Sequence, residues 1–165
     1  MSADLYSIIF VTIKDRILQH KDSLANLKNL RSSISFEGWF KIESIRALNG
    51  IVDRVGNKGS DLILKNDLPA IELKASTDNL TKNYFTNNAN KLYSVPVLFI
   101  AGKGQRTLEQ ITSEILFTII GQEQINNELM LSLVKPLDNM GPNNIPTIIR
   151  TEKLNDVQGN CIRSD

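Results

Sequence analysis

The sequence predicts a single α/β domain in which helices cover a mixed β-sheet. Two stretches before residue 50 carry apolar residues at helical spacing, which indicates two amphipathic helices. Residues 59–75 contain two short strand-like runs around a polar turn, the pattern of a β-hairpin. Residues 95–101 form a continuous apolar run, as expected of a strand buried on both faces. Helices followed by strands, and then by alternating helix and strand, favour a layered α/β structure.

The first segment, residues 3–30, has leucine and isoleucine at spacings of three and four. This pattern predicts an amphipathic helix with a break near residues 21–23. Its apolar stripe either covers the core or pairs with a second copy of the chain. His20 is expected on the solvent side of this helix.

Residues 34–48 predict a second helix, which stops at Asn49-Gly50. Apolar residues occupy much of its circumference, so we expect it to be deeply packed. Two acids, Glu37 and Glu43, interrupt that surface. Residues 51–55 then read as the first strand.

The hairpin places two acids face to face. If its turn is centred on Asn66-Asp67, counting outward sets Asp61 opposite Glu72, and the period of two puts Lys74 on the same face. Opposed like charges are destabilising unless something lies between them, and a divalent metal ion fits that position. The opposite face is apolar and consists of Leu62, Leu64, Ile71, Leu73 and Ala75.

The remaining chain predicts a loop and helix over residues 80–92, the buried strand, a further helix and a final strand at residues 128–134. Thr107 and Gln110 have the spacing of a capping box at the start of that further helix. Its stripe is expected to continue to Gly121. The stripe consists of Leu108, Ile111, Ile115 and Ile119.

Composition limits the chemistry. Cys161 is the single cysteine and His20 the single histidine of the 165 residues, so neither an internal disulfide nor a Cys/His zinc site can form. Any metal must be held by oxygen, which favours Mg²⁺ or Mn²⁺. The net charge of +1 indicates that a nucleic-acid partner would be bound by a local patch. Without a basic N-terminal region or a long apolar run, we expect a cytoplasmic protein with no membrane contact.

The order of acids and lysine matches a known pattern. Glu37 on a helix, then Gly-Ser-Asp61-Leu, then Ile-Glu72-Leu-Lys74, followed by a helix and a buried strand, resembles the PD-(D/E)xK nuclease superfamily, which has the restriction-endonuclease-like fold. The proline that gives the motif its name is replaced here by Ser60.

The resemblance implies a core of helix, three strands, helix and strand over about residues 33–121. An N-terminal helical extension, residues 3–30, precedes this core, and a C-terminal strand with a flexible tail, residues 122–165, follows it. The helix acid of the family maps to Glu37, because the longer interval before Asp61 leaves room for the first strand, and Glu43 is the alternative.

The resemblance also implies roles for these residues. Asp61 and Glu72, with a backbone carbonyl near Leu73, would hold Mg²⁺, and Mn²⁺ is expected to substitute. Lys74 would place a positive charge beside the scissile phosphate. Glu37 would bind a metal ion through water or hold a second ion.

Several cations near the motif are candidates for contact with phosphates. The asparagine-rich residues 83–90 either read bases or form an ordinary surface helix. The candidate phosphate contacts are Lys58, Lys82, Lys91, Lys103 and Arg106.

The sequence therefore favours a magnesium-dependent DNA endonuclease, of the restriction type or of the junction and repair type. We expect a homodimer that cuts both strands and needs no small-molecule cofactor. The alternative is a catalytically inactive DNA-binding or assembly module with the same fold. An inhibitor or antitoxin-like interaction protein is a third reading.

Overall fold

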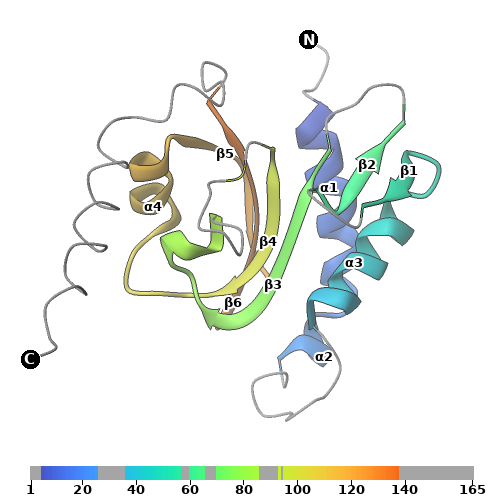
Figure 1. The fold of residues 1–165 in the computed structure, drawn as a ribbon. Coiled ribbons are helices and arrows are strands. Elements are labelled where there is room, and N and C mark those ends of the chain that lie inside the picture. Colours follow the sequence, from blue (N-terminus) through green and yellow to red (C-terminus); the bar gives the residue numbers. More distant parts are fainter. Residues whose placement is uncertain are drawn as a thin grey trace, which may run out of the picture.

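A mixed four-stranded sheet forms the centre of the protein (Figure 1). β3 (Glu72–Asn79) and β4 (Val97–Gly102) run parallel, while β6 (Leu129–Pro136) is antiparallel to β4 and β5 (Phe117–Gln124) is antiparallel to β6. The predicted mixed sheet of an α/β protein is thus confirmed. The computed structural model describes residues 5–25, 36–56, 60–65, 70–85, 93 and 95–137.

The predicted register of the hairpin is present at one point. β1 (Val52–Val55) and β2 (Leu62–Leu64) pair as an antiparallel ribbon. Leu62 and Ile71 exchange two backbone hydrogen bonds of 2.9 Å, which joins this ribbon to the chain just before β3. Among the described residues this bridge is the only pairing of the predicted hairpin. β2 pairs with β1 instead, and β3 pairs with β4. The turn residues 66–69 lie outside the described part of the chain.

Two of the helices cover one face of the sheet, as Figure 1 shows. α1 (Leu5–Leu18) is followed after a two-residue break by the short α2 (Lys21–Leu24), and α3 (Phe36–Ala47) packs beside α1. A helix is thus present in each of the two predicted segments, of which residues 26–35 lie outside the described ranges. The expected deep packing of the second helix was wrong, since Ile42 is 52% exposed. The apolar residues of both helices meet the apolar face of the predicted hairpin. That face is closed by Leu62, Leu64, Ile71 and Leu73, all buried, with Ala75 packed beside them.

An ion-pair cluster ties α1 to α3. Glu43 is buried, with 3% of its surface exposed, and accepts hydrogen bonds from Arg16 and Arg46. His20 lies 3.4 Å from the same carboxylate and packs edge-on against Trp39. The expectation of a solvent-side His20 was wrong, because the break after α1 turns the imidazole toward α3.

α4 (Leu108–Ile115) covers the opposite face of the sheet together with the 3₁₀ helix η2 (Lys82–Phe85). The predicted capping box is confirmed, since Thr107 accepts from the Gln110 backbone and the Gln110 side chain accepts from the Thr107 backbone. Of the helix expected at residues 80–92, η2 is the described part, and residues 86–92 lie outside it.

α4 ends earlier than its apolar spacing predicts. Leu116 adopts the left-handed conformation with φ of 57°, which stops the helix. Ile119 and Gly121 therefore belong to β5, and the expected helical stripe to Gly121 was wrong. Pairing of β5 with the buried strand β6 satisfies the backbone in place of helical hydrogen bonds.

The sheet continues beyond residue 121. The predicted strand near residues 128–134 is present as β6, whose residues from Leu129 to Val134 are all buried. β5 bends at a register irregularity between Ile119 and Gly121, where the Phe10 ring of α1 packs against Gly121. None of the helices within the described ranges is long and apolar enough to cross a membrane. Residues 138–165, the expected tail, are outside those ranges.

Candidate active site

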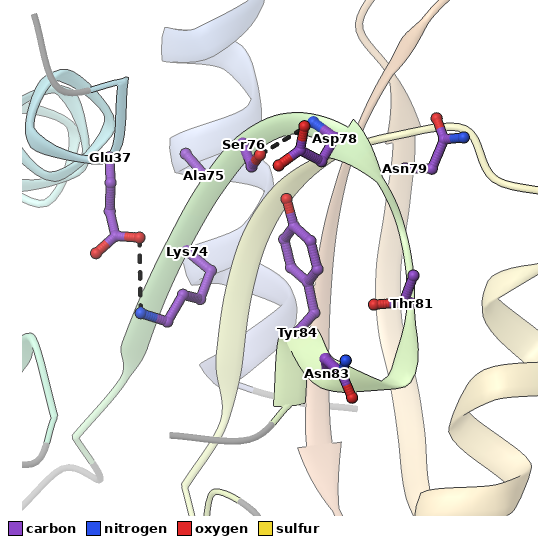
Figure 2. A pocket seen from close by; sticks show the side chains of 9 residues that line it. All are labelled: Glu37, Lys74, Ala75, Ser76, Asp78, Asn79, Thr81, Asn83 and Tyr84. Atoms are coloured by element: carbon purple, nitrogen blue, oxygen red, sulfur yellow. Dashed lines mark hydrogen bonds and ion pairs between the residues drawn. The ribbon is translucent and has the colours of Figure 1, made fainter. Parts of the chain in front are cut away.

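The four residues predicted from the hairpin register and from the family resemblance lie near one another at the start of β3. Glu37 lies in the first turn of α3, Asp61 directly precedes β2, and Glu72 and Lys74 lie on β3. Nζ of Lys74 is 3.6 Å from Oε2 of Glu37 and 4.0 Å from Oε1 of Glu72. Figure 2 shows the Lys74 side chain reaching from the strand toward Glu37 on the helix. Residues far apart in sequence thus form one charged cluster at the exposed edge of the sheet.

Asp61 is held through both carboxylate oxygens. Its Oδ2 accepts a hydrogen bond of 3.0 Å from the backbone N–H of Leu73, and its Oδ1 lies 2.7 Å from Nζ of Lys41. Lys41 was not among the predicted site residues. It follows Glu37 by four positions, which places both side chains on one face of α3, and this spacing was the available signal.

Glu72 is buried, with 6% of its surface exposed. Burial first, and the negative charge of Asp61 second, raise the pKa of Glu72 to about 7, although the charge of Lys74 opposes the rise. The Tyr93 hydroxyl hydrogen-bonds to the Glu72 carboxyl group, and burial beside this acid raises the pKa of Tyr93. Tyr93 was also missed, because nothing in its sequence neighbourhood connects it to Glu72.

The chemistry of this cluster suits a divalent cation. Three carboxyl groups, those of Glu37, Asp61 and Glu72, face two lysines, Lys41 and Lys74. Oε2 of Glu72 is buried without a hydrogen-bond partner among the described residues. A hard cation such as Mg²⁺ would satisfy this oxygen and relieve the repulsion from Asp61. Within the described part of the chain, no three His, Cys, Asp or Glu side chains are already clustered so as to hold a metal ion.

Glu43 occupies a different environment from Glu37. Burial alone would raise the pKa of Glu43, but the hydrogen bond and charge of Arg16, and the charges of Arg46 and His20, lower it. The two glutamates of α3 therefore point to different partners. Glu37 lies at the Lys74 cluster, whereas Glu43 links α3 to α1.

An open groove of about 380 Å³ leads away from Lys74 along β3 toward η2 (Figure 2). Within the described part of the chain, Lys74 is the single cation that lines it, and two acids, Glu37 and Asp78, border it. The remaining lining side chains are mostly small or uncharged and polar. The lining residues are Glu37, Lys74, Ala75, Ser76, Asp78, Asn79, Thr81, Asn83 and Tyr84.

The other predicted phosphate contacts are dispersed. Lys82 begins η2 and Lys103 directly follows β4, and both are exposed, but neither lines the groove. Arg106 forms an ion pair with Glu114 of α4. Lys58 and Lys91 lie outside the described residues. Of the asparagine-rich segment, Asn83 borders the groove, and residues 86–90 are also outside the described ranges.

No related protein indicates a function for this cluster of charged residues. Comparison of the chain with protein-family models, with curated proteins and with solved structures found no match in any of the three.

Proposed function

We propose that this protein is a divalent-metal-dependent DNA endonuclease with a restriction-endonuclease-like fold. The observation that carries the proposal is that Glu37 and Glu72 both lie within 4.0 Å of Lys74, while the negative charge of Asp61 is near enough to raise the pKa of Glu72. A buried acid with an unpartnered oxygen beside a second acid is costly unless a cation is bound there. The sequence therefore maintains a destabilising arrangement, which is common at functional sites.

The order of elements supports the fold proposal. α3, β1, β2, β3 and β4 follow in the order of helix, three strands and final strand. The resemblance also implies a helix before the final strand, and the 3₁₀ helix η2 is the described part of that segment. The isolated bridge between Leu62 and Ile71 joins the β1–β2 ribbon to the residue just before β3, the edge strand of the sheet β3-β4-β6-β5. Asp61 and Glu72 flank this bridge directly, which brings the two acids together.

Each residue has a role that follows from its position. Asp61 and Glu72 would hold Mg²⁺, which when bound polarises a phosphodiester and lowers the pKa of a water molecule. Lys74, at 29% side-chain exposure, can reach both the acids and solvent, so its ammonium can orient the scissile phosphate and stabilise its developing charge. No other cation lines the groove among the described residues, so the phosphate would lie at its Lys74 end and the neutral bases over its polar walls.

A cleavage assay tests the proposal. Supercoiled plasmid and branched DNA substrates are incubated with the protein in Mg²⁺, in Mn²⁺ or in EDTA. We expect nicked or linear products with either metal and none with EDTA. Asp61→Asn should abolish cleavage, and Asp22→Asn, the same change at an exposed position on α2, should not. Equal cleavage by the Asp61 variant, or no cleavage by the unaltered protein on any substrate, would refute the enzymatic function.

A second candidate is a DNA-binding or assembly module of the same fold without activity. The observation in its favour is that both oxygens of Asp61 already have partners within the chain, Lys41 and Leu73. DNA retention in a gel-shift assay without cleavage under any metal would support this module over the nuclease.

A further inference from the structure

Lys41 contacts the acid that the proposed nuclease would need for its metal ion. Its Nζ lies 2.7 Å from Oδ1 of Asp61, and the two side chains are only 25% and 20% exposed. A charge-assisted hydrogen bond of this length is strong, and partial burial reduces its screening by water. Among the described groups, Lys41 is the cation closest to Asp61.

The hydrogen bonds of the two Asp61 oxygens differ in how easily they can be broken. Oδ2 is bound to the backbone N–H of Leu73, a fully buried residue of β3, so releasing it would leave a buried donor unsatisfied. Oδ1 is bound to the end of a flexible lysine side chain, which can rotate into solvent. An ion that binds Asp61 therefore gains access most easily through Oδ1.

We propose that Lys41 and a divalent cation compete for Oδ1 of Asp61, so that Lys41 sets the metal affinity of the site. This inference rests on the proposed function and adds a residue to it. The ammonium of Lys41 occupies the coordinating oxygen and repels an incoming cation. Removing its positive charge should therefore tighten metal binding.

Lys74 does not have the same relation to the acids. Its Nζ is 4.0 Å from Glu72 and 3.6 Å from Glu37, both beyond hydrogen-bond distance. Loss of Lys74 would leave every oxygen of Asp61 engaged. The competition is therefore specific to Lys41 and to Asp61.

Isothermal titration calorimetry with Mn²⁺ tests the proposal without DNA and without turnover. Lys41→Gln removes the charge but keeps an amide donor that can hold Oδ1, so Asp61 stays in place. Lys41→Met is the second variant and removes the donor too. Lys14→Gln is the matched control, because Lys14 is 26% exposed, lies on a helix, and pairs with Glu123 on β5 instead of with the site. Circular dichroism melting shows that each protein is folded.

We expect Lys41→Gln to bind Mn²⁺ at least about tenfold more tightly than the unaltered protein, which corresponds to about 1.4 kcal/mol. Lys14→Gln should bind as the unaltered protein does. Unchanged or weaker binding by both Lys41 variants would overturn the competition, whereas Asp61-dependent binding and cleavage by the unaltered protein would leave the proposed function standing. If neither the unaltered protein nor any variant bound Mn²⁺, both the proposed function and the competition by Lys41 would be refuted.

Discussion

The backbone N–H of Leu73 lies 3.0 Å from Oδ2 of Asp61 and donates a hydrogen bond to it. Leu73 stands between Glu72 and Lys74 on β3, so the carboxylate before β2 is fixed to the strand that bears the other two charges. In a longer hairpin the Leu73 N–H would donate to a backbone carbonyl of the opposite strand. Here the Asp61 carboxylate accepts that hydrogen bond instead. This one hydrogen bond therefore fixes the position of a candidate metal ligand relative to the sheet.

Because of the hydrogen bond from Leu73, two substitutions of Asp61 should differ in stability. Asparagine can still accept from Leu73, so Asp61→Asn should change the free energy of unfolding by less than about 1 kcal/mol, the value of a partly exposed ion pair. Alanine leaves the buried N–H unsatisfied and should cost about 1–3 kcal/mol more. Urea unfolding of both variants measures the difference. Both should lose more than about 100-fold in cleavage, since even groups behind a metal ligand are worth 10–100-fold. Equal stability of the two variants would show that the bond contributes nothing.

Glu72 makes stability depend on pH in the absence of divalent ions. Its pKa is raised from 4.5 to about 7 in the folded protein, so the folded state binds this proton more tightly than the unfolded chain. Stability from this group is therefore present below pH 4.5 and lost as the pH rises to about 7. Glu72→Gln lacks this loss and should be more stable than the unaltered protein above pH 7, by up to about 3 kcal/mol.

Denaturation in EDTA at pH 4.5, 6, 8 and 9 measures this dependence. The stability difference between Glu72→Gln and the unaltered protein should grow with pH and then level off above pH 7. Glu43, whose lowered pKa acts in the opposite direction in acid, is present in both proteins and cancels. A constant difference across the range would contradict the buried, charge-repelled state of Glu72.

The two glutamates of α3 offer the same chemical change in two environments. Glu37→Gln removes a carboxylate that is 41% exposed, so stability should fall by less than about 1 kcal/mol, while cleavage falls at least about tenfold. Glu43→Gln removes the buried partner of Arg16 and Arg46 and should cost roughly 2–4 kcal/mol. Its cleavage per folded molecule should be unchanged. A large loss of activity in Glu43→Gln with normal stability would reverse these assignments.

Gly121 tests how closely α1 packs on the sheet. A Cβ at this position would lie 2.3 Å from Cδ1 of Phe10, so Gly121→Ala should destabilise the protein by about 1–3 kcal/mol. Phe10→Leu removes the ring, and in that background the same alanine should cost measurably less. A double-mutant cycle by urea unfolding gives this interaction energy, and purely additive effects would show that the ring does not restrict the site.

Local patterns predicted much of the fold. The bridge of Leu62 with Ile71 follows from counting outward from the turn, and the buried β4 follows from its apolar run. The end of α4 was missed because Ile115 and Ile119 have helical spacing, while the left-handed Leu116 leaves no mark in the sequence. Strand pairing with β6 decided the structure there, and such pairing is a tertiary effect.

The candidate site was predictable to a similar extent. The strand period and the hairpin register identified Asp61, Glu72 and Lys74. Glu37, which lies on α3, was identified by the family resemblance. Lys41 contacts Asp61 through the folding of distant segments, and its four-residue spacing from Glu37 was the local signal for it. No local rule could select Tyr93, which contacts Glu72 only in the folded protein.

Ion pairs add to the burial of Phe40 in fixing the rotation of α3 about its axis. Apolar residues lie on more than one side of this helix, and Ile42 is left 52% exposed. At 3.6 residues per turn, Glu37 and Lys41 project about 40° apart, and Glu43 projects roughly opposite to Lys41. Ion pairs on these two sides, toward the sheet edge and toward α1, therefore oppose rotation of the helix about its axis. High ionic strength should loosen the orientation of α3 before it unfolds the helix.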